Sequence, residues 1–496
     1  MAGLANNLHR NRHLVNNETD ADGGRGGWQQ GEGVPSRHAH ARQHGGVRQW
    51  RLVVTAAKIA SGQSISVVVA LINLVAIVVV GLSLTGAYAP SARADGDEPQ
   101  YEDFYLPPDP LPPGQPGDLI RTEPSRLVLE PSGQLGAILA TGTRIMYRST
   151  DARGNPIAVT GTYFEPDNPW PGNGPRPLIS YAPGTQGQGN QCAPSRMFNQ
   201  GIHYSGGWDI MFNYEELFVA TMVARGFAIV MTDYEGLGTP PMHTYVNRLA
   251  EGQAVLDAAR AAMRLPGTSL DPNGPVAFWG YSQGGGAVGS AAELASTYAP
   301  ELHIVGSYAG APVADLKVLL PFADGSALVG VVGYAINGAI AAYPEYADAI
   351  RAKLTPRGED MLASVARQCV GQTLIDFAFR HLQPYFVEDV WQTINAEPFS
   401  SLLDLQRLGR YKPNAPVLID SNRYDPLVPW TAANQLGRDW CALGADVEFR
   451  TNEEPPFLNK LVINHALPML VDGEPAMQWI AARFNGLPTT PNCGSF

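Results

Sequence analysis

Residues 276–286 read VAFWGYSQGGG, a short apolar run that ends in the pattern Gly-x-Ser-x-Gly. The segment from Ala287 to Ser296 that follows is rich in small residues and is compatible with a helix. A sharp turn from strand to helix exposes the serine hydroxyl, and it needs glycine two residues before and two residues after the serine. Gly280 and Gly284 meet that need around Ser282, and the N-terminus of the following helix favours negative charge near the hydroxyl. The pattern predicts a nucleophile at Ser282. The alternative is a glycine-rich turn without a chemical role, because the pattern alone is weak in a chain with 53 glycines.

Strands and helices alternate along much of the chain, which predicts an α/β fold. Two strands are expected between Gly142 and Phe164, around a turn at residues 151–156. Further on, short apolar runs predict buried parallel strands at Leu178–Ala182, Ala228–Thr232, Val276–Trp279, Ile304–Ala309 and Val417–Ile419, and helices are expected at Glu216–Arg225, Val246–Met263, Gly285–Tyr298 and Ala432–Leu443. These elements predict a mostly parallel sheet with helices on both faces. Ligands bind such sheets at the carboxyl ends of the strands, where Ser282 is expected.

The alternation stops between Val313 and Arg410, and this span is mainly helical by composition. It separates two parts of the expected core, residues 126–312 and 411–496. Within it, Gly325–Pro344 carries no charge, but four glycines and an asparagine favour a buried helical hairpin over a second membrane span. A helical cap above the strand ends would form an apolar pocket suited to an acyl chain. The alternative is additional core that does not contact a substrate.

A nucleophilic serine needs a histidine as its base and a carboxylate that orients the imidazole. In parallel-sheet enzymes of this kind the order along the chain is serine, acid, histidine. Three histidines follow Ser282: His303 in an expected strand, His381 in the expected cap, and His465 in an expected loop before the last helix. His465 is therefore the predicted base, and a surface histidine without a role is the alternative.

The acid is expected in the loop after a late strand. Asp425 lies past the end of the strand at residues 415–420, where a side chain can reach a neighbouring loop. Asp420 still belongs to that strand and is the second candidate.

Two N–H groups are expected to stabilise the oxyanion that forms when a serine attacks an acyl group. One is the backbone N–H of Gln283, directly after the serine. The other is expected from Thr185 or Gln186 in the segment Tyr181–Gly187, where glycines let the backbone turn its N–H groups inward. An ordinary glycine-rich turn is the alternative at this segment.

The first part of the chain has a different composition. Residues 1–64 are expected to form a disordered leader. Ile65–Leu84 is a run of twenty residues without a charge, and basic residues before it and acidic residues after it predict that the following chain is exported. Its length favours an uncleaved membrane anchor, whereas Ala92-Arg93-Ala94 fits a signal-peptidase site, so residues 65–94 are either an anchor or a signal peptide. The long leader also fits a true start downstream of Met1. Residues 95–125, rich in proline and acid, are expected to be a linker.

Charge and cysteine content agree with export. The net charge of −12 argues against nucleic acid as a partner. The four cysteines, Cys192, Cys369, Cys441 and Cys493, all follow the apolar segment, and an even number beyond an export signal predicts two disulfides. Their spacing permits three pairings and matches no zinc pattern. No metal or organic cofactor is expected.

Several longer motifs occur at Tyr181–Ser195, Asp233–Gly236, Gly280–Gly285, Ser296–Gly306, Asn395–Phe399, Asp425–Pro429 and Cys441–Ala445. Together they resemble the secretory lipases of the fungal lipase A type, from about residue 125 to Cys493. The resemblance implies an α/β-hydrolase core, an inserted helical lid at residues 313–410, and a serine lipase or carboxylesterase that acts on triacylglycerol or related lipid esters.

The resemblance also implies a role for each matching residue. By position, Ser282 is the nucleophile, Asp425 orients His465, and His465 is the base. Gly280, Tyr281 and Gly284 form the nucleophile elbow, Gln186 and Gln283 donate oxyanion N–H groups, and the cysteines pair as Cys192–Cys369 and Cys441–Cys493.

Two departures from the fungal type qualify these implications. The fungal members carry acidic residues where this chain has Thr185 and Gln186, so a backbone donor is expected there. The fungal type also continues into a C-terminal flap, whereas this chain stops at Phe496, so neither strong interfacial activation nor a preference for very long acyl chains is expected.

A peptidase or acyltransferase of the same architecture is the rival function. Peptidases usually need charged anchors for a peptide terminus, and the uncharged span at residues 325–344 argues against one. A non-catalytic exported binding protein is a less favoured rival, because serine, acid and histidine are all present in the expected order.

Overall fold

The computed structural model of the protein describes residues 102–130, 132–204, 210–458 and 460–496. The expected leader, the apolar segment Ile65–Leu84 and the expected cleavage site at Ala92-Arg93-Ala94 lie outside the described residues. The alternatives for this segment, an anchor or a cleaved signal, therefore stay predictions.

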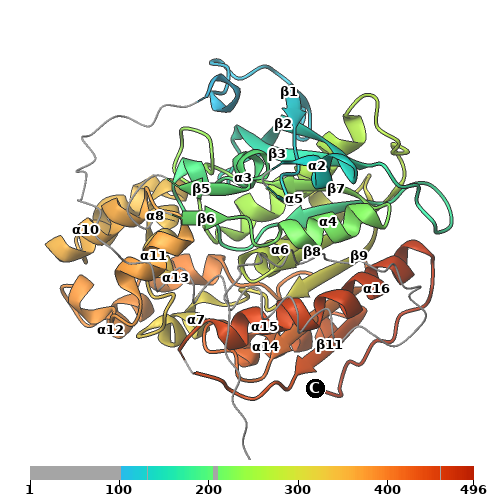
Figure 1. The fold of residues 1–496 in the computed structure, drawn as a ribbon. Helices are drawn as coiled ribbons and strands as arrows, with labels where there is room; N and C mark the ends of the chain where they lie inside the picture. The colour runs from blue at the N-terminus through green and yellow to red at the C-terminus, as the bar shows by residue number, and fades with distance from the viewer. Residues whose placement is uncertain (1–101, 131, 205–209, 459) are drawn as a thin grey trace, which may run out of the picture. The chain divides into compact units, whose positions relative to one another are not determined.

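In the described residues, a nine-stranded sheet has the strand order β1-β2-β3-β7-β4-β8-β9-β10-β11 (Figure 1). Each neighbouring pair in the series β1, β2, β3 and β7 is antiparallel, and the strands from β7 across to β11 run parallel. Every residue of β4 and β7 is buried, which explains why these strands read as continuous apolar runs. The strands are β1 Leu119–Ser125, β2 Ala140–Thr150, β3 Pro156–Pro166, β4 Leu178–Ala182, β7 Ala228–Thr232, β8 Pro275–Tyr281, β9 His303–Gly310, β10 Val417–Asn422 and β11 Val447–Asn452. A separate hairpin joins β5 Ile202–Tyr204 and β6 Ile210–Phe212.

Helices cover both faces of the sheet. On one face lie α5 Arg248–Arg264, α6 Gln283–Tyr298 and α14 Trp430–Ala442, and on the other lie α3 Pro194–Gln200, α4 Glu216–Ala224, α15 Ile463–Val471 and α16 Gly473–Phe484. The short α2, Gln134–Ala137, packs beside β2. Small residues let α5 and α6 lie close to the strands, since Ala254, Ala258 and Ala291 are fully buried. The expected two-faced α/β arrangement is therefore present, with element ends within a few residues of those predicted.

Residues 313–410, called the cap from here on, are mainly helical and are drawn in yellow to orange beside the sheet in Figure 1. Its helices are α7 Leu316–Ala323, α8 Val331–Ala342, α9 Ala347–Arg351, α10 Pro356–Val365, α11 Val370–Phe377, α12 Val390–Asn395 and α13 Phe399–Leu405. The expected hairpin at residues 325–344 is wrong in one respect, because this segment holds one helix, α8, after a series of turns. Buried Tyr334 and Val332 of α8 pack with Val365 of α10 to form the core of the cap. Among the described residues, none of the helices has both the length and the apolar character needed to cross a membrane.

The described part of the expected linker is packed against the core. Phe104 and Tyr105 are buried, and the guanidinium of Arg196 lies 3.7 Å from the centre of the Tyr105 ring. Further on, β1 pairs with β2 along residues 119–125. The high proline content of this segment predicts a linker, so composition alone does not indicate the buried aromatic pair or strand β1.

Candidate active site

The turn around Ser282 has the predicted sharp geometry. The strand β8 ends at Tyr281 and α6 begins at Gln283, and Ser282 between them has φ 60° and ψ −117°, a strained conformation for a residue with a side chain. A Cβ on Gly280 would lie 2.3 Å from the carbonyl oxygen of Gly284, and a Cβ on Gly284 would lie 2.0 Å from that of Ala182. Both positions therefore require glycine.

Three side chains that are far apart in sequence meet at this turn. His465 Nε2 lies 2.8 Å from Ser282 Oγ, and His465 Nδ1 lies 2.7 Å from Asp425 Oδ2. The side chains of Asp425 and His465 are 0% and 7% exposed. Such a line of hydrogen bonds suits proton transfer from the serine to the imidazole, because the buried carboxylate stabilises the imidazolium that results.

Asp425 and His465 are each held by a further contact. Oδ1 of Asp425 accepts hydrogen bonds from the N–H groups of Leu427 and Val428, both at 2.9 Å, which leaves Oδ2 directed at the imidazole. The hydroxyl of Tyr281 donates to the carbonyl oxygen of His465 at 2.8 Å. The sequence predicts Tyr281 as an elbow residue, and nothing in the pattern indicates this second contact across 184 positions.

His465 lies in the first turn of α15 rather than in the loop that the sequence predicts. Pro468 inside this helix explains the difference, since proline in such a run reads as a helix breaker. The other candidates lie elsewhere. His303 is exposed at the start of β9, and the Nδ1 of exposed His381 pairs with Asp324 at 2.9 Å.

Asp420, the second candidate for the acid, lies within β10 and is buried. Burial and the neighbouring Asp472 carboxylate raise the pKa of Asp420 well above its usual range. The imidazole of His465 forms its hydrogen bond with Asp425 and, among the described residues, none with Asp420.

The two predicted oxyanion segments lie at the site. Thr185 lines the same cavity as Ser282, and its carbonyl oxygen accepts a hydrogen bond from the Tyr214 hydroxyl at 3.0 Å. The side chain of Gln186 donates to Glu215 at 3.2 Å, so a donor from this residue to an oxyanion would be its backbone N–H. In the described part of the chain, the N–H groups of Thr185, Gln186 and Gln283 have no hydrogen-bond acceptor.

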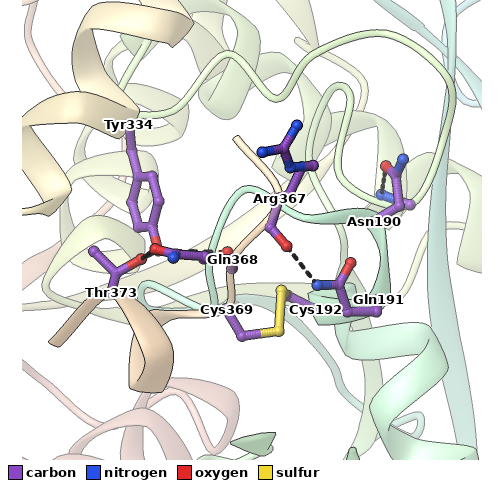
Figure 2. Close-up of a disulfide and its surroundings, with 9 residues drawn as sticks. Asn190, Gln191, Cys192, Tyr334, Arg367, Gln368, Cys369 and Thr373 are labelled. Carbon is purple, nitrogen blue, oxygen red and sulfur yellow. Dashed lines mark hydrogen bonds between the residues drawn. A yellow bond between two sulfur atoms is a disulfide. The ribbon is translucent and has the colours of Figure 1, made fainter. Parts of the chain in front are cut away.

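A disulfide ties the segment after Gln186 to the cap (Figure 2). Cys192 pairs with Cys369, at the start of α11, and Val370 donates its N–H to the Gln186 carbonyl oxygen at 2.8 Å. Figure 2 also shows the Gln191 side chain donating to the carbonyl oxygen of Arg367, at 2.7 Å. The segment that holds two candidate oxyanion donors is therefore fastened to the cap as well as to the core.

The second disulfide joins Cys441 in α14 to Cys493 near the C-terminus. Both pairings are those that the resemblance implies.

A cavity of about 420 Å³ opens at Ser282 and His465 between the core and the cap. Most of its wall comes from apolar side chains of the cap. These include Leu316, Leu319, Leu320, Leu328, Val331, Val332, Ala335, Ile336, Ala339, Ile350, Leu374, Leu382, Phe386, Trp391, Ile394, Leu402 and Leu403. A wall of this kind favours an apolar group beside the serine.

Two buried glutamates lie behind the candidate oxyanion segments, and the sequence analysis does not find them. Glu215 accepts hydrogen bonds from Gly184 N–H and the Gln186 side chain, and Glu251 accepts one from the Gln283 side chain at 2.7 Å. Burial raises the pKa of Glu215 to about 8 and that of Glu251 to about 8. Acidic residues in or beside predicted helices ordinarily face solvent, so the sequence does not indicate that these two glutamates are buried.

The family model of the secretory lipases matches residues 206–492, which is more than half of the chain. The chain belongs to the secretory lipase family.

Curated relatives of this secretory lipase come from bacteria and fungi. It is 28% identical over 394 residues to a "probable inactive lipase" of Mycobacterium tuberculosis, an alignment that covers 79% of this chain and 84% of the relative. It is 27% identical over 412 residues to Lipase 10 of Candida albicans, covering 80% and 83%.

Solved structures confirm the fold of this secretory lipase. Candida antarctica lipase A matches with a TM-score of 0.67 and 23% identity over 79% of this chain and 88% of that chain. The esterase LipA of Xanthomonas oryzae matches with a TM-score of 0.59 and 19% identity over 75% and 98%. The predicted α/β-hydrolase fold is confirmed, and family membership indicates an exported ester hydrolase.

Proposed function

We propose that this secretory lipase hydrolyses acyl esters of lipids, such as triacylglycerols, through an acyl-enzyme on Ser282. The observation that carries the proposal is the hydrogen-bonded line from Asp425 through His465 to Ser282, at the wall of an apolar cavity. One relative carries the name of an inactive lipase, so the presence of all three side chains in contact is what supports activity here.

In the proposed reaction, His465 takes the proton of Ser282 as Oγ bonds to the ester carbonyl carbon. The carbonyl oxygen becomes an oxyanion, which accepts hydrogen bonds from the N–H of Gln283 and from that of Thr185 or Gln186. His465 then gives its proton to the departing alcohol as the carbon–oxygen bond breaks. Water repeats the steps on the acyl-enzyme and releases the acid. Each oxyanion donor contributes about 3 kcal/mol to this stabilisation.

The cap at residues 313–410 is proposed as the lid and as the binding site of the acyl chain. Its side chains Val332, Ile336 and Leu403 line the cavity and offer apolar surface without hydrogen-bonding groups that a peptide backbone would need. An acyl chain buried there would also exclude water from Ser282.

We also propose that the enzyme acts outside the cytoplasm, either secreted or anchored by residues 65–84. Two disulfides support export, because such bonds persist in oxidising compartments. N-terminal sequencing of the cell-associated and the released protein would distinguish the anchored from the cleaved form.

The test of the function is a panel of p-nitrophenyl esters of rising chain length, with tributyrin and aminoacyl substrates beside them. We expect hydrolysis of the acyl esters, loss of that activity in Ser282→Ala, and stoichiometric labelling of the wild-type serine by a fluorophosphonate. Turnover of the aminoacyl substrates alone would overturn the lipase proposal in favour of a peptidase.

A further inference from the structure

Glu215 lies at the centre of the contacts that hold the segment Gly184–Gln186. Its Oε2 accepts hydrogen bonds from the Gly184 N–H at 2.8 Å and from the Gln186 side chain at 3.2 Å. Its Oε1 lies 3.2 Å from the hydroxyl oxygen of Tyr181 on β4. One carboxyl group therefore contacts both ends of the segment that contains Thr185, a candidate source of the second oxyanion donor.

The buried position of Glu215 disfavours an ionised carboxylate. The residue is 0% exposed and also lines the cavity that holds Ser282. In the described part of the chain, no arginine or lysine forms an ion pair with it. A carboxylate here would repel an oxyanion that forms nearby, and burial already raises the pKa of Glu215 to about 8.

The tyrosines that surround Glu215 also have raised pKa values. Burial comes first among the causes that raise the pKa of each neighbouring tyrosine above its ordinary value. The titratable groups around it are Tyr181 on β4, Tyr214 beside it, Glu216 at the start of α4, Tyr234 after β7, and Tyr245, His465 and Lys353, which share the cavity.

We propose that Glu215 is a positioning residue that fixes the backbone of Gly184–Gln186 so that this segment can donate an N–H to the oxyanion. The proposal rests on the serine hydrolase function proposed above. The protonated carboxyl suits all three contacts at once. Its carbonyl oxygen, Oε2, accepts the two N–H donors. The Tyr181 hydroxyl donates to Oε1 in the structure, and this bond can reverse when Oε1 carries the proton, because a tyrosine hydroxyl both donates and accepts.

A glutamine side chain reproduces this arrangement without a charge, since its amide oxygen accepts and its NH₂ donates. A leucine has a similar volume and makes none of the contacts. Glu216 offers a matched control on the same segment. It is 7% exposed, burial raises its pKa to about 8, and in the described part of the chain no hydrogen bond joins it to Gly184–Gln186.

The experiment measures kcat and KM of purified Glu215→Gln, Glu215→Leu and Glu216→Leu on p-nitrophenyl butyrate, with the thermal midpoint of each. Hydrolysis by Ser282→Ala is subtracted as background. We expect Glu215→Leu to lower kcat about 100-fold at pH 7 with KM changed less than about threefold, because one oxyanion donor is misplaced. Glu215→Gln should keep kcat within about threefold, and Glu216→Leu should do the same even where its thermal midpoint falls.

The pH profile is the second readout. The neutral form of Glu215 is lost as pH rises through about 8, so its ionisation lowers wild-type kcat between pH 7 and pH 9. Glutamine cannot ionise, so the ratio of kcat at pH 9 to kcat at pH 7 should be up to about tenfold higher in Glu215→Gln. Glu251, which has the same predicted direction, remains in both proteins and does not affect this comparison.

Three results would overturn the proposal: a folded Glu215→Leu with wild-type kcat, a Glu215→Gln as impaired as the leucine variant, or an unchanged pH ratio in Glu215→Gln. Where the leucine variant does not fold, the glutamine variant decides alone. A wild-type protein that hydrolyses no ester would instead contradict the proposed function, so the two failures are distinguishable.

Discussion

The core and the cap meet at one cavity but line it with different chemistry. On the core side, Ser282, His465 and Glu215 are polar groups held by hydrogen bonds to other parts of the sheet domain. On the cap side the wall is mostly apolar, as at Ile336 and Leu403. We propose that this difference is a functional division, in which the core performs the chemistry and the cap selects the substrate. The Cys192–Cys369 disulfide joins the two regions beside a candidate oxyanion segment.

The first test of this division concerns the core. Asp425→Asn should lower kcat about ten-thousandfold with little change in KM, because the asparagine holds the imidazole of His465 in the wrong tautomer. Steady-state kinetics on p-nitrophenyl butyrate measure the loss.

Asp420→Asn is the matched control, because Asp420 lies on β10 and, among the described residues, forms no hydrogen bond with His465. Its kcat should stay within about twofold of wild type. Since the folded state binds a proton at Asp420 more tightly than the unfolded chain, wild-type stability should fall as pH rises above the ordinary aspartate range, and the asparagine variant should lose that dependence. An equal loss of kcat in both variants would contradict the assignment of the acid.

The two disulfides test the connection between core and cap. They close segments of 177 and 52 residues, so removing either pair by serine substitution should lower the free energy of unfolding, by about 5 and about 4 kcal/mol respectively. Loss of Cys192–Cys369 should also lower kcat about tenfold, since it frees the segment near Gln186, which carries a candidate oxyanion donor.

The pair Cys441–Cys493 lies within the core, away from the cavity, and its removal should leave kcat of the folded protein unchanged. Denaturant unfolding and kinetics below the unfolding transition separate the two effects. Equal kinetic effects from both pairs would show that the cap does not influence the oxyanion segment.

The cap is tested by narrowing the cavity. Ala339 of α8 lines it, and Ala339→Phe should lower the ratio of kcat/KM for dodecanoate to that for butyrate by about tenfold or more, because an added ring excludes the longer chain. Ala341→Phe, on the same helix but off the cavity wall, should leave the ratio unchanged. An equal fall in activity on esters of all chain lengths would contradict a role of α8 in selecting the acyl chain.

The smallest effect is expected at Tyr281, a core residue that contacts His465 through the backbone. Tyr281→Phe removes the hydrogen bond to the His465 carbonyl and should lower kcat about fivefold, the value of one hydrogen bond of about 1 kcal/mol. The acyl-chain preference should not change, and a changed preference would weaken the division between core and cap.

Local pattern accounts for much of the core. Strands such as β4 and β7 are buried on both faces and therefore read as unbroken apolar runs. The turn at Ser282 was predictable because backbone contacts around Gly280 and Gly284 exclude any Cβ, a constraint that the sequence displays directly. The order of serine, acid and histidine then narrowed the partners to Asp425 and His465.

The remaining features depend on contacts between segments that are far apart in the sequence, and such contacts produce no periodic pattern of residues. Tyr281 donates a hydrogen bond to His465, and Glu215 accepts hydrogen bonds from Gly184 and Gln186. Nearby prolines argue against the packing of Tyr105 and the helix around His465, although the structure has both. The sequence by itself determined the sheet, the elbow and the chemical types of the catalytic candidates, because these follow from local sterics and the burial of adjacent residues. The tertiary structure alone decided which polar groups share a buried space, and thus which carboxyl groups have a raised pKa, since burial is a property of the whole fold.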